Sequence, residues 1–336
     1  MASRVRWTGS GIVNAKTRVR VLYLARGTED LYNTVRGYLP ADFELVTLAG
    51  DTPEEVYRHL SVCEVIVVAT RRLDAAMIAA ATQLRLVVHQ GVGYHDTVDA
   101  PALRERGAAL AITPDGTATT VAEHAVMLML AACRHLAFAD SELRAGRFHV
   151  NALRLKSQTL AGRKIGYIGM GRIGRATALR LREWGTSGLY VDPLALPGTS
   201  EAELGVRRVT LDELLAQADI VSLHVPLTQD TRTMIDARAF ARMKAGAVLV
   251  NTARGPDVDQ AALVSALDSG HLGAAGFDVF EQEPVTANHP LARFENVVLT
   301  PHIAAATRDT FDAKMSGVFE RIRRFYGDEP MQDQVF

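Results

Sequence analysis

The stretch that decides the fold is Arg163-Lys164-Ile165-Gly166-Tyr167-Ile168-Gly169-Met170-Gly171-Arg172-Ile173-Gly174. Its short apolar run predicts a buried strand that breaks into Gly169-x-Gly171-x-x-Gly174, and residues 175–184 favour a helix. In a dinucleotide site the first glycine makes the tight turn, the second lets the backbone approach a pyrophosphate, and the third allows close helix–strand packing. The pyrophosphate then lies at the positive end of the helix. The stretch therefore predicts dinucleotide binding.

An acidic residue follows at the spacing that such a site requires. A second short strand, at residues 189–191, ends at Asp192, 18 residues beyond Gly174 (192 − 174). A carboxylate there accepts hydrogen bonds from the ribose hydroxyls of NAD and repels the 2′-phosphate of NADP. Neither Pro193 nor Leu194 supplies a cation that would offset this repulsion. We therefore predict NAD as the cofactor; the alternative is a structural strand–turn–helix with a solvated aspartate.

Composition and charge exclude several classes of protein. The chain has 37 basic and 38 acidic residues and a formal net charge of −1, which argues against nucleic acid or a membrane as the main partner. Cys63 and Cys133 lie in apolar runs and predict buried, reduced thiols, as in a cytoplasmic protein. We see no secretory signal within residues 1–16 and no apolar run of the roughly 20 residues that a membrane span needs. No Cys/His spacing suggests a metal site.

Strand and helix patterns alternate along the chain, which predicts the α/β class with two Rossmann-like, doubly wound parallel-sheet domains. A length of 336 residues also suggests about two domains. Strands are expected at residues 19–25, 44–48, 62–69, 84–89 and 108–112, and then at 165–168, 189–191, 220–224, 248–251, 276–279 and 297–299. Helices are expected at residues 53–60, 74–81, 175–184, 211–217, 260–269 and 307–325.

A long helix is expected at residues 120–145, after the turn-rich Thr113-Pro114-Asp115-Gly116. Thr120 and Glu123 have the spacing of a capping box at its start. The helix is apolar almost all round, whereas a surface helix shows a single apolar stripe. We therefore expect it to be buried between domains or subunits.

Three polar side chains follow predicted strands of the second sheet: Arg254, Glu283 and His302. Ligands of such sheets bind outside the carboxyl ends of the strands, so these side chains are expected at the edge that holds the cofactor. Reduction of a 2-oxo acid adds hydride to a carbonyl carbon and a proton to its oxygen. A histidine exchanges that proton, a neighbouring carboxylate stabilises the imidazolium, and an arginine grips the substrate carboxylate.

Each of these residues also has a structural interpretation. An Arg-Gly pair after a strand is often only a turn, a glutamate before proline can be a solvated loop acid, and a histidine after Thr-Pro can be a structural imidazole. The occurrence of all three at strand ends of one dinucleotide domain favours the catalytic interpretation.

The chain resembles the D-isomer-specific 2-hydroxyacid dehydrogenase family from about residue 60 onward. Besides the glycine-rich stretch, the matching motifs are His224-Val225-Pro226-Leu227-Thr228, Asn251-Thr252-Ala253-Arg254-Gly255, Phe277-Asp278-Val279-Phe280-x-x-Glu283-Pro284 and Leu299-Thr300-Pro301-His302-Ile303. The resemblance implies NAD-dependent interconversion of a small 2-oxo acid and a D-2-hydroxy acid. It also implies that Arg254 binds the substrate, that His302 is the acid/base and that Glu283 pairs with His302.

The resemblance further implies a set of cofactor contacts. Gly169, Gly171 and Gly174 form the turn, Arg172 and Ile173 touch the pyrophosphate, and Asp192 binds the adenosine ribose. The adenine–ribose side would be lined by Val225, Pro226 and Thr231, the nicotinamide side by Thr252 and Ala253, and the carboxamide would be held by Asp278.

The domain organisation is also implied by the resemblance. A discontinuous, flavodoxin-like substrate domain would contain residues 1–113 and a returning C-terminal helix in residues 304–336, with an NAD-binding domain at residues 114–303 inserted between them. The two lobes would close over the substrate and exclude water. A homodimer built around the helix at residues 120–145 is implied as well.

The loop Gln90-Gly91-Val92-Gly93-Tyr94-His95-Asp96 follows a predicted strand of the first domain. Glycines on both sides of Val92 free backbone N–H groups that can cradle an anion. The resemblance implies that Val92 and Gly93 hold the substrate carboxylate, although residues 94–99 are one residue longer than the usual pattern.

Other functions remain open on the same fold. A nicotinamide-sensing binding module, such as the transcriptional corepressors that reuse this fold, could keep all three polar residues. Formate dehydrogenase is disfavoured because it carries glutamine in place of Glu283. A phosphoglycerate-type enzyme with a regulatory domain is disfavoured because the chain stops soon after its last helix.

Overall fold

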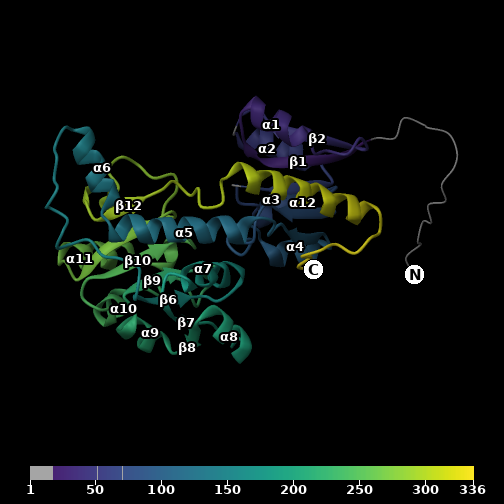
Figure 1. Ribbon diagram of the computed structural model, residues 1–336. Helices are drawn as coiled ribbons and strands as arrows, with labels where there is room; N and C mark the ends of the chain where they lie inside the picture. The colour runs from purple at the N-terminus through teal and green to yellow at the C-terminus, as the bar shows by residue number, and fades with distance from the viewer. Residues whose placement is uncertain (1–17, 51, 70) are drawn as a thin grey trace, which may run out of the picture. The chain divides into compact units, whose positions relative to one another are not determined.

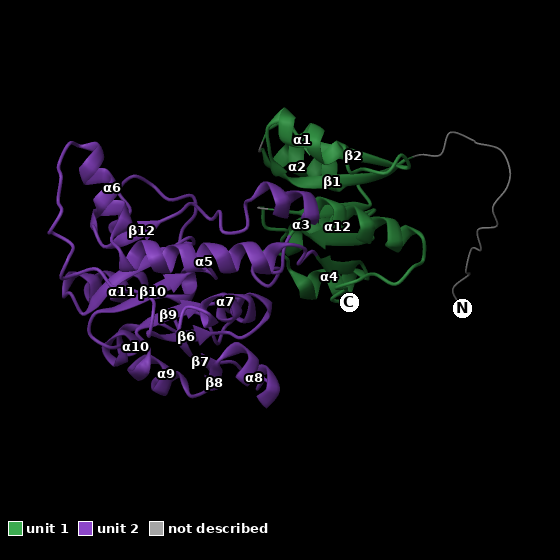
Figure 2. Cartoon of the chain, in the orientation of Figure 1, with its two compact units in different colours: residues 1–90, 97–112, 315–336 green, residues 91–96, 113–314 purple. Residues whose placement is uncertain are grey.

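The computed structural model describes residues 18–50, 52–69 and 71–336, which form two compact units (Figures 1 and 2). Unit 1 contains the described residues up to 90 together with residues 97–112 and 315–336, and unit 2 contains residues 91–96 and 113–314. The expectation that residues 1–16 carry no secretory signal concerns a segment outside the described residues.

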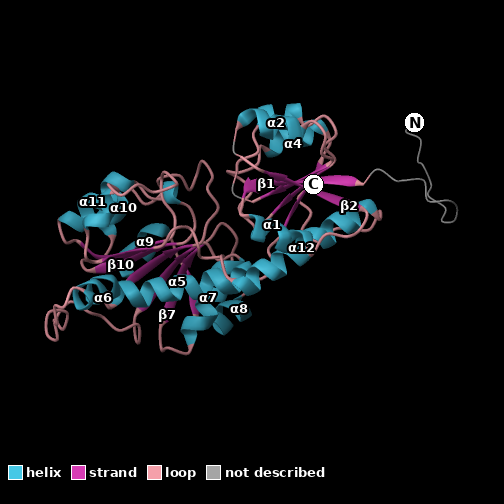
Figure 3. Ribbon diagram, turned by 90° about the horizontal axis from the view of Figure 1, so that it is seen from above, coloured by secondary structure: helices cyan, strands magenta, loops and turns pink. Residues whose placement is uncertain are grey.

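Unit 1 is built on a five-stranded parallel sheet with the order β2-β1-β3-β4-β5. This is the flavodoxin-like order, and all five predicted strands are present. Figure 3 shows helices on both faces of the sheet, with α2 and α4 over one face and α1 and α12 over the other. The elements are β1 Val19–Arg26, α1 Glu29–Arg36, β2 Phe43–Leu48, α2 Pro53–Leu60, β3 Val65–Val68, α3 Ala75–Ala80, β4 Leu86–His89, α4 Ala100–Arg106, β5 Ala109–Ile112 and the larger part of α12 Arg308–Tyr326, from residue 315 onward.

The last residues of the chain pair with strand β5, at the edge of the same sheet. Ala111 forms an antiparallel bridge with Gln334. The N–H of Val335 donates to the carbonyl of Leu110 at 2.7 Å, and the N–H of Leu110 donates to the carbonyl of Phe336 at 3.1 Å. A short antiparallel segment therefore covers the edge of an otherwise parallel sheet.

Unit 2 is built on a seven-stranded parallel sheet with the order β12-β11-β10-β9-β6-β7-β8. β6 is the first strand of this sheet along the chain; β7 and β8 follow on one side of it, and β9 to β12 follow on the other. This is the strand order of a doubly wound dinucleotide-binding sheet. Six strands were expected and all six are present, although β11 covers residues 272–277 and not the expected 276–279. The seventh, β8, was missed because it has three residues, two of them arginine. The strands are β6 Lys164–Ile168, β7 Ser187–Val191, β8 Val206–Arg208, β9 Ile220–Leu223, β10 Ala247–Asn251, β11 Leu272–Phe277 and β12 Val297–Leu299.

Helices cover both faces of this sheet (Figure 3), and the buried apolar residues form two separate cores. One core contains Leu214 of α9, Phe240 of α10 and Leu263 of α11. The other contains Leu128 of α5 and Leu181 of α7. The helices of unit 2 are α5 Thr117–Cys133, α6 Leu136–Arg144, α7 Arg172–Arg182, α8 Gly198–Leu204, α9 Leu211–Gln217, α10 Ala237–Arg242 and α11 Gln260–Asp268.

The prediction of one continuous helix at residues 120–145 is wrong. The segment forms α5 and α6, which are bent by 65° at a break where His135 has a φ of 49°. A left-handed residue cannot continue a right-handed helix. The capping box is wrong as well, because α5 is capped by Gly116 and the Thr120 hydroxyl donates to the Gly116 carbonyl from within the first turn.

In the part of the chain that the structure describes, no single helix is long and apolar enough to cross a membrane. Only α5 and α6 taken together meet the length and composition of a span, across their 65° bend.

Candidate functional site

The glycine-rich turn joins β6 to α7 and has the shape that a pyrophosphate needs. Gly169 has a φ of 92°, and a Cβ at this position would lie 2.5 Å from the carbonyl oxygen of His224. A Cβ on Gly174 would lie 2.3 Å from the carbonyl oxygen of Gly169, so α7 packs directly on the turn. Gly171 has no neighbouring atom within 4 Å of its Cβ position and caps α7 without a side-chain hydrogen bond. The N-terminus of α7, which begins with Arg172 and Ile173, is therefore open to an anion.

Asp192 follows β7 and lies beside this turn. Its carboxylate accepts the N–H of Met170 at 2.8 Å and the N–H of Leu194 at 2.9 Å. Each oxygen keeps acceptor capacity for a ribose hydroxyl. The residues next to Asp192 in the sequence include no cation, but in the structure Arg208 of β8 lies beside it. Nη2 of Arg208 donates to the backbone carbonyls of Asp192 and Pro193 at 2.8 and 2.9 Å.

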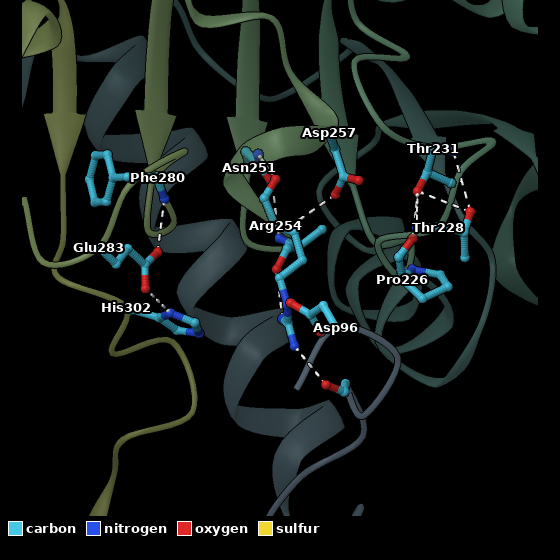
Figure 4. A network of polar contacts seen from close by, with 12 residues as sticks. Asp96, Pro226, Thr228, Thr231, Asn251, Arg254, Asp257, Phe280, Glu283 and His302 are labelled. Atoms are coloured by element: carbon cyan, nitrogen blue, oxygen red, sulfur yellow. Dashed lines mark hydrogen bonds and ion pairs between the residues drawn. The ribbon is translucent and has the colours of Figure 1, made fainter. Parts of the chain in front are cut away.

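The loop after β9 borders the same turn. The Thr231 hydroxyl donates to the Pro226 carbonyl at 2.7 Å and accepts the N–H of Thr228 at 2.8 Å, which closes the loop (Figure 4). A Cβ on Gly169 would touch Val225 at 3.0 Å. The loop at residues 225–231 therefore packs directly against the glycine-rich turn.

Two cofactor candidates follow β10. The Thr252 hydroxyl is buried and has no hydrogen-bond partner among the described residues. Buried hydroxyls are normally satisfied, so an orphaned one marks a place where a ligand group fits. The N–H of its neighbour Ala253 donates to Asn251 at 2.9 Å. Together with the open glycine turn and Asp192, the residues present fit a nicotinamide dinucleotide.

His302 and Glu283 form a direct pair after the last two strands (Figure 4). Nδ1 of His302 lies 2.7 Å from Oε2 of Glu283, and the other carboxylate oxygen accepts the N–H of Phe280 at 2.9 Å. Burial alone raises the pKa of Glu283, but the hydrogen bonds from His302 and Phe280 and the charges of His302 and Arg254 bring it below its usual value. Glu283 is therefore ionised at neutral pH and fixes the imidazole by its Nδ1 side.

Asp278 is completely buried and anchors the loop that carries His302. Its carboxylate accepts the Thr300 hydroxyl at 2.6 Å and the N–H groups of Ile303 and Ala304 at 2.9 and 2.8 Å. Burial raises the pKa of Asp278, but these bonds and one from His124 lower it overall. Because a buried carboxylate with three donors resists displacement, it sets the position of the His302 backbone.

Arg254 follows β10, and all its nitrogens are engaged (Figure 4). Nε donates to the carboxylate of Asp96 at 2.9 Å, Nη2 to the carbonyl of Gly93 at 3.1 Å, and Nη1 to the carbonyl of Ala253 at 2.9 Å. The structure thus brings the loop of Val92 and Gly93 to the predicted substrate arginine. Sequence reasoning missed the ion pair with Asp96, because 158 residues separate the two.

A second carboxyl group missed from the sequence lies behind Arg254. Asp257 is completely buried and accepts the backbone N–H of Arg254 at 3.1 Å, while its Oδ1 has no partner among the described residues. Burial raises the pKa of Asp257 to about 7, although hydrogen bonds and the Arg254 charge oppose the rise. Only its position between two apolar residues, Pro256 and Val258, hinted at burial.

The raised pKa predicts an unusual pH dependence of stability. The unfolded chain loses the Asp257 proton near pH 4, whereas the folded chain keeps it until about pH 7, so this residue makes stability fall as pH rises between these values. Asp257→Asn does not titrate and retains an acceptor for Arg254. We expect its Tm, relative to the parent, to rise by roughly 2–4 °C or more from pH 5 to pH 8. The exposed Asp230→Asn serves as control, and a pH-independent difference would contradict a protonated buried carboxyl.

Fold and site together define the class. A doubly wound sheet with a glycine turn, an acidic residue after its second strand and a His–Glu–Arg set at the carboxyl edge is typical of a nicotinamide-dependent oxidoreductase.

Comparison with known proteins identifies the family. Residues 126–304 match the model of the D-isomer specific 2-hydroxyacid dehydrogenase, NAD binding domain. A glyoxylate reductase of Korarchaeum cryptofilum is 39% identical over 289 residues, which cover 84% of this chain and 86% of that protein. A solved glyoxylate reductase from Paecilomyes thermophila superposes with a TM-score of 0.83 at 29% identity, covering 95% of this chain and 98% of that one. The chain belongs to the D-isomer-specific 2-hydroxyacid dehydrogenase family, whose members are NAD-dependent oxidoreductases.

A longer relative is similar as well. A D-3-phosphoglycerate dehydrogenase of Mycobacterium leprae is 40% identical over 264 residues, which cover 78% of this chain. The chain spans 49% of the length of that relative.

Proposed function

We propose that the protein interconverts a small 2-oxo acid and its D-2-hydroxy acid, with His302 as acid/base, Glu283 as its partner and Arg254 as the carboxylate-binding residue. The observation that carries this proposal is the 2.7 Å contact between His302 Nδ1 and Glu283 Oε2 at the sheet edge that also presents Arg254 (Figure 4). The pair follows the last two strands, at the carboxyl edge where sheets of this kind bind their ligands.

The pair is arranged for proton transfer at the other imidazole nitrogen. Glu283 holds Nδ1, which leaves Nε2 of His302 to donate a proton to the carbonyl oxygen or to remove one from the hydroxyl. The ionised Glu283 stabilises the imidazolium and prevents rotation of the ring. About half of the His302 side chain is exposed, so a substrate can reach it.

Arg254 supplies the charge that orients the substrate. A guanidinium presents paired N–H groups that match a carboxylate, and its charge also polarises the adjacent carbonyl. The backbone of the loop at Val92 and Gly93 would complete the anion site from the other side.

The residues that would hold NAD are Gly169, Gly171, Arg172, Ile173 and Gly174 at the pyrophosphate, Asp192 with Val225, Pro226 and Thr231 at the adenosine, and Thr252, Ala253 and Asp278 at the nicotinamide. Bound NAD(H) supplies or accepts the hydride. The open space over Gly171 and the orphaned Thr252 hydroxyl support this placement.

The test is a spectrophotometric assay. Purified protein with NADH and a panel of glyoxylate, hydroxypyruvate and pyruvate is expected to lose absorbance at ~340 nm with at least one of them. Ranking the panel by kcat/KM would identify the preferred side chain. If NADH binds but no small 2-oxo acid is reduced, the proposed activity is wrong, and the result favours a protein that senses the nicotinamide cofactor.

Cofactor choice gives a separate prediction. Asp192→Ser removes the carboxylate that repels a 2′-phosphate and leaves Arg208 beside the vacated position. We expect kcat/KM for NADPH to rise and kcat/KM for NADH to fall, each by about tenfold or more, since a tenfold change needs only about 1.4 kcal/mol. In Asp192→Ser combined with Arg208→Ala, the gain with NADPH should be lost. An unchanged preference in the single variant would place the ribose elsewhere.

We propose the domain roles that the family implies. Residues 114–303 would bind NAD, and residues 1–113 together with residues 304–336 would form the substrate domain. The match of residues 126–304 to an NAD-binding family model supports the first assignment. The flavodoxin-like order of the first sheet supports a separate lobe.

We propose a homodimer formed through α5 and α6. No residue of α6 is buried, and apolar side chains are exposed along α6 and the segment after it: Leu136, Leu143, Phe148, Val150 and Leu155. A cavity of about 560 Å³ lies beside them, lined in part by Phe138, Leu153 and Phe294. Contiguous exposed apolar side chains mark association surfaces, and a second copy of the chain would cover these.

Light scattering tests the dimer. The parent is expected at twice the chain mass of 36.5 kDa. The double variant Leu136→Glu with Leu143→Glu should shift it to the single mass, because two buried unpaired charges would cost several kcal/mol. Val62→Glu, at an exposed apolar residue of unit 1, should leave the mass unchanged. If the parent protein has the mass of one chain in solution, the proposed homodimer is wrong.

We propose that the protein works in the cytoplasm. Cys63 and Cys133 are both free and buried. Burial raises the pKa of Cys63 to about 12 and that of Cys133 to about 11, so both stay protonated and inert. Structural thiols of this kind suit a reducing compartment.

A further inference from the structure

Arg254, which we propose to bind the substrate carboxylate, forms an ion pair with Asp96 of the same unit. Nε of Arg254 lies 2.9 Å from Oδ2 of Asp96, and each side chain is about one quarter exposed. The arginine therefore already carries a carboxylate of the protein on its Nε side. A substrate must use the remaining N–H groups of Nη1 and Nη2, each of which has one further hydrogen.

The loop that carries Asp96 is fitted closely to the guanidinium. A Cβ on Gly93 would collide with Nη2 of Arg254, so a side chain at this position would push the guanidinium away. The carbonyl of Gly93 then accepts Nη2 at 3.1 Å. Two contacts from one short loop, through Asp96 and Gly93, therefore hold the guanidinium in place.

The local charges nearly cancel as a result. Asp96 offsets Arg254, and Glu283 offsets a protonated His302. Asp257 adds a further buried carboxyl behind Arg254. A substrate with one carboxylate finds one cation with free hydrogen-bond donors, but a second anionic group would add negative charge to a site where Asp96 already offsets that cation.

We propose that Asp96 restricts the enzyme to monoanionic 2-oxo acids, whose side chains carry no negative charge. The proposal rests on the proposed function, because it takes Arg254 to be the carboxylate-binding residue. Two like charges about 6–7 Å apart near a protein surface repel strongly enough to lower binding by roughly tenfold to a hundredfold. Asp96 therefore acts on specificity through charge, not on the reacting atoms.

The test compares two ligands of nearly equal shape that differ by one charge: 2-oxoglutarate and its 5-methyl ester. The parent is expected to favour the ester in kcat/KM by about tenfold or more. Asp96→Asn should reduce this preference by about tenfold, Asp96→Glu should retain it, and Glu281→Gln, which removes an exposed carboxylate from the Glu283 loop, should leave it unchanged. A parent that prefers the dianion, or an Asp96→Asn variant that slows both substrates equally, would overturn the proposal.

A second measurement separates this proposal from the catalytic one. Dissociation constants of the same two ligands, measured by calorimetry on protein saturated with NAD⁺, do not depend on turnover. The ester is expected to bind more tightly to the parent, and Asp96→Asn should narrow the difference. Failure to turn over any 2-oxo acid, together with this binding pattern, would remove the catalytic proposal alone. Equal affinities in the parent would remove the charge selection alone.

Discussion

Replacing His302 with asparagine is expected to lower kcat by about 10²–10⁴-fold, the usual contribution of a general acid or base. Asparagine tolerates the left-handed backbone that His302 adopts, with a φ of 53°, so the loop should keep its shape. Because Asp278 anchors that loop through the backbone N–H groups of Ile303 and Ala304, NADH binding should change by less than about threefold. Steady-state kinetics with the best 2-oxo acid measure kcat. A fluorescence titration with NADH measures the affinity for the cofactor.

The chain offers a matched control. His149 also lies 2.8 Å from a glutamate, Glu142, but on the segment after α6 and not at a strand end. His149→Asn is expected to leave kcat unchanged, whereas Glu283→Gln should lower it, though less than His302→Asn. A His302→Asn variant that works at the parent rate would show that another group transfers the proton.

Replacing Arg254 with lysine is the second change with a large expected effect. Lysine keeps the charge but cannot bond Asp96, Gly93 and Ala253 at once, nor present a planar pair of N–H groups to a carboxylate. Loss of charge-assisted bonds worth about 3–4 kcal/mol lowers kcat/KM by about 10²–10³-fold. Both KM and kcat should change, because the carboxylate is held in the ground state and the polarised carbonyl in the transition state.

A control variant and a control measurement show whether the effect of Arg254→Lys is specific to substrate binding. Arg238→Lys, at an exposed arginine of α10, should behave as the parent. The affinity of Arg254→Lys for NADH should also be near that of the parent, since the Arg254 side chain bonds Asp96, Ala253 and Gly93 and not the glycine-rich turn. An Arg254→Lys enzyme with the parent KM would assign the substrate carboxylate to another group.

Much of the architecture could be predicted from the sequence because its signals are local. Buried parallel strands give continuous apolar runs, and a turn that needs a φ of 92° needs glycine, so Gly169 is visible without any tertiary information. The carboxyl-edge rule then selected Arg254, Glu283 and His302, and the structure places Glu283 and His302 in contact. Their catalytic roles stay a prediction until tested.

What the sequence did not reveal depends on tertiary contacts or on weak local signals. The break at His135 has no glycine or proline to mark it, because the chain reads Cys133-Arg134-His135-Leu136 and helix-compatible residues continue on both sides. Strand β8 ends in two arginines and has no apolar run. The ion pair between Asp96 and Arg254 depends on how the loop at residues 90–96 packs. The raised pKa of Asp257 depends on its burial in the folded chain.

The antiparallel segment at residues 333–336 has a practical consequence. The backbone groups of Leu110 that it satisfies would otherwise be exposed at the rim of unit 1, where another chain could add a strand and nucleate aggregation. An affinity tag joined directly after Phe336 would begin within this sheet, so a flexible spacer is needed to keep the rim closed.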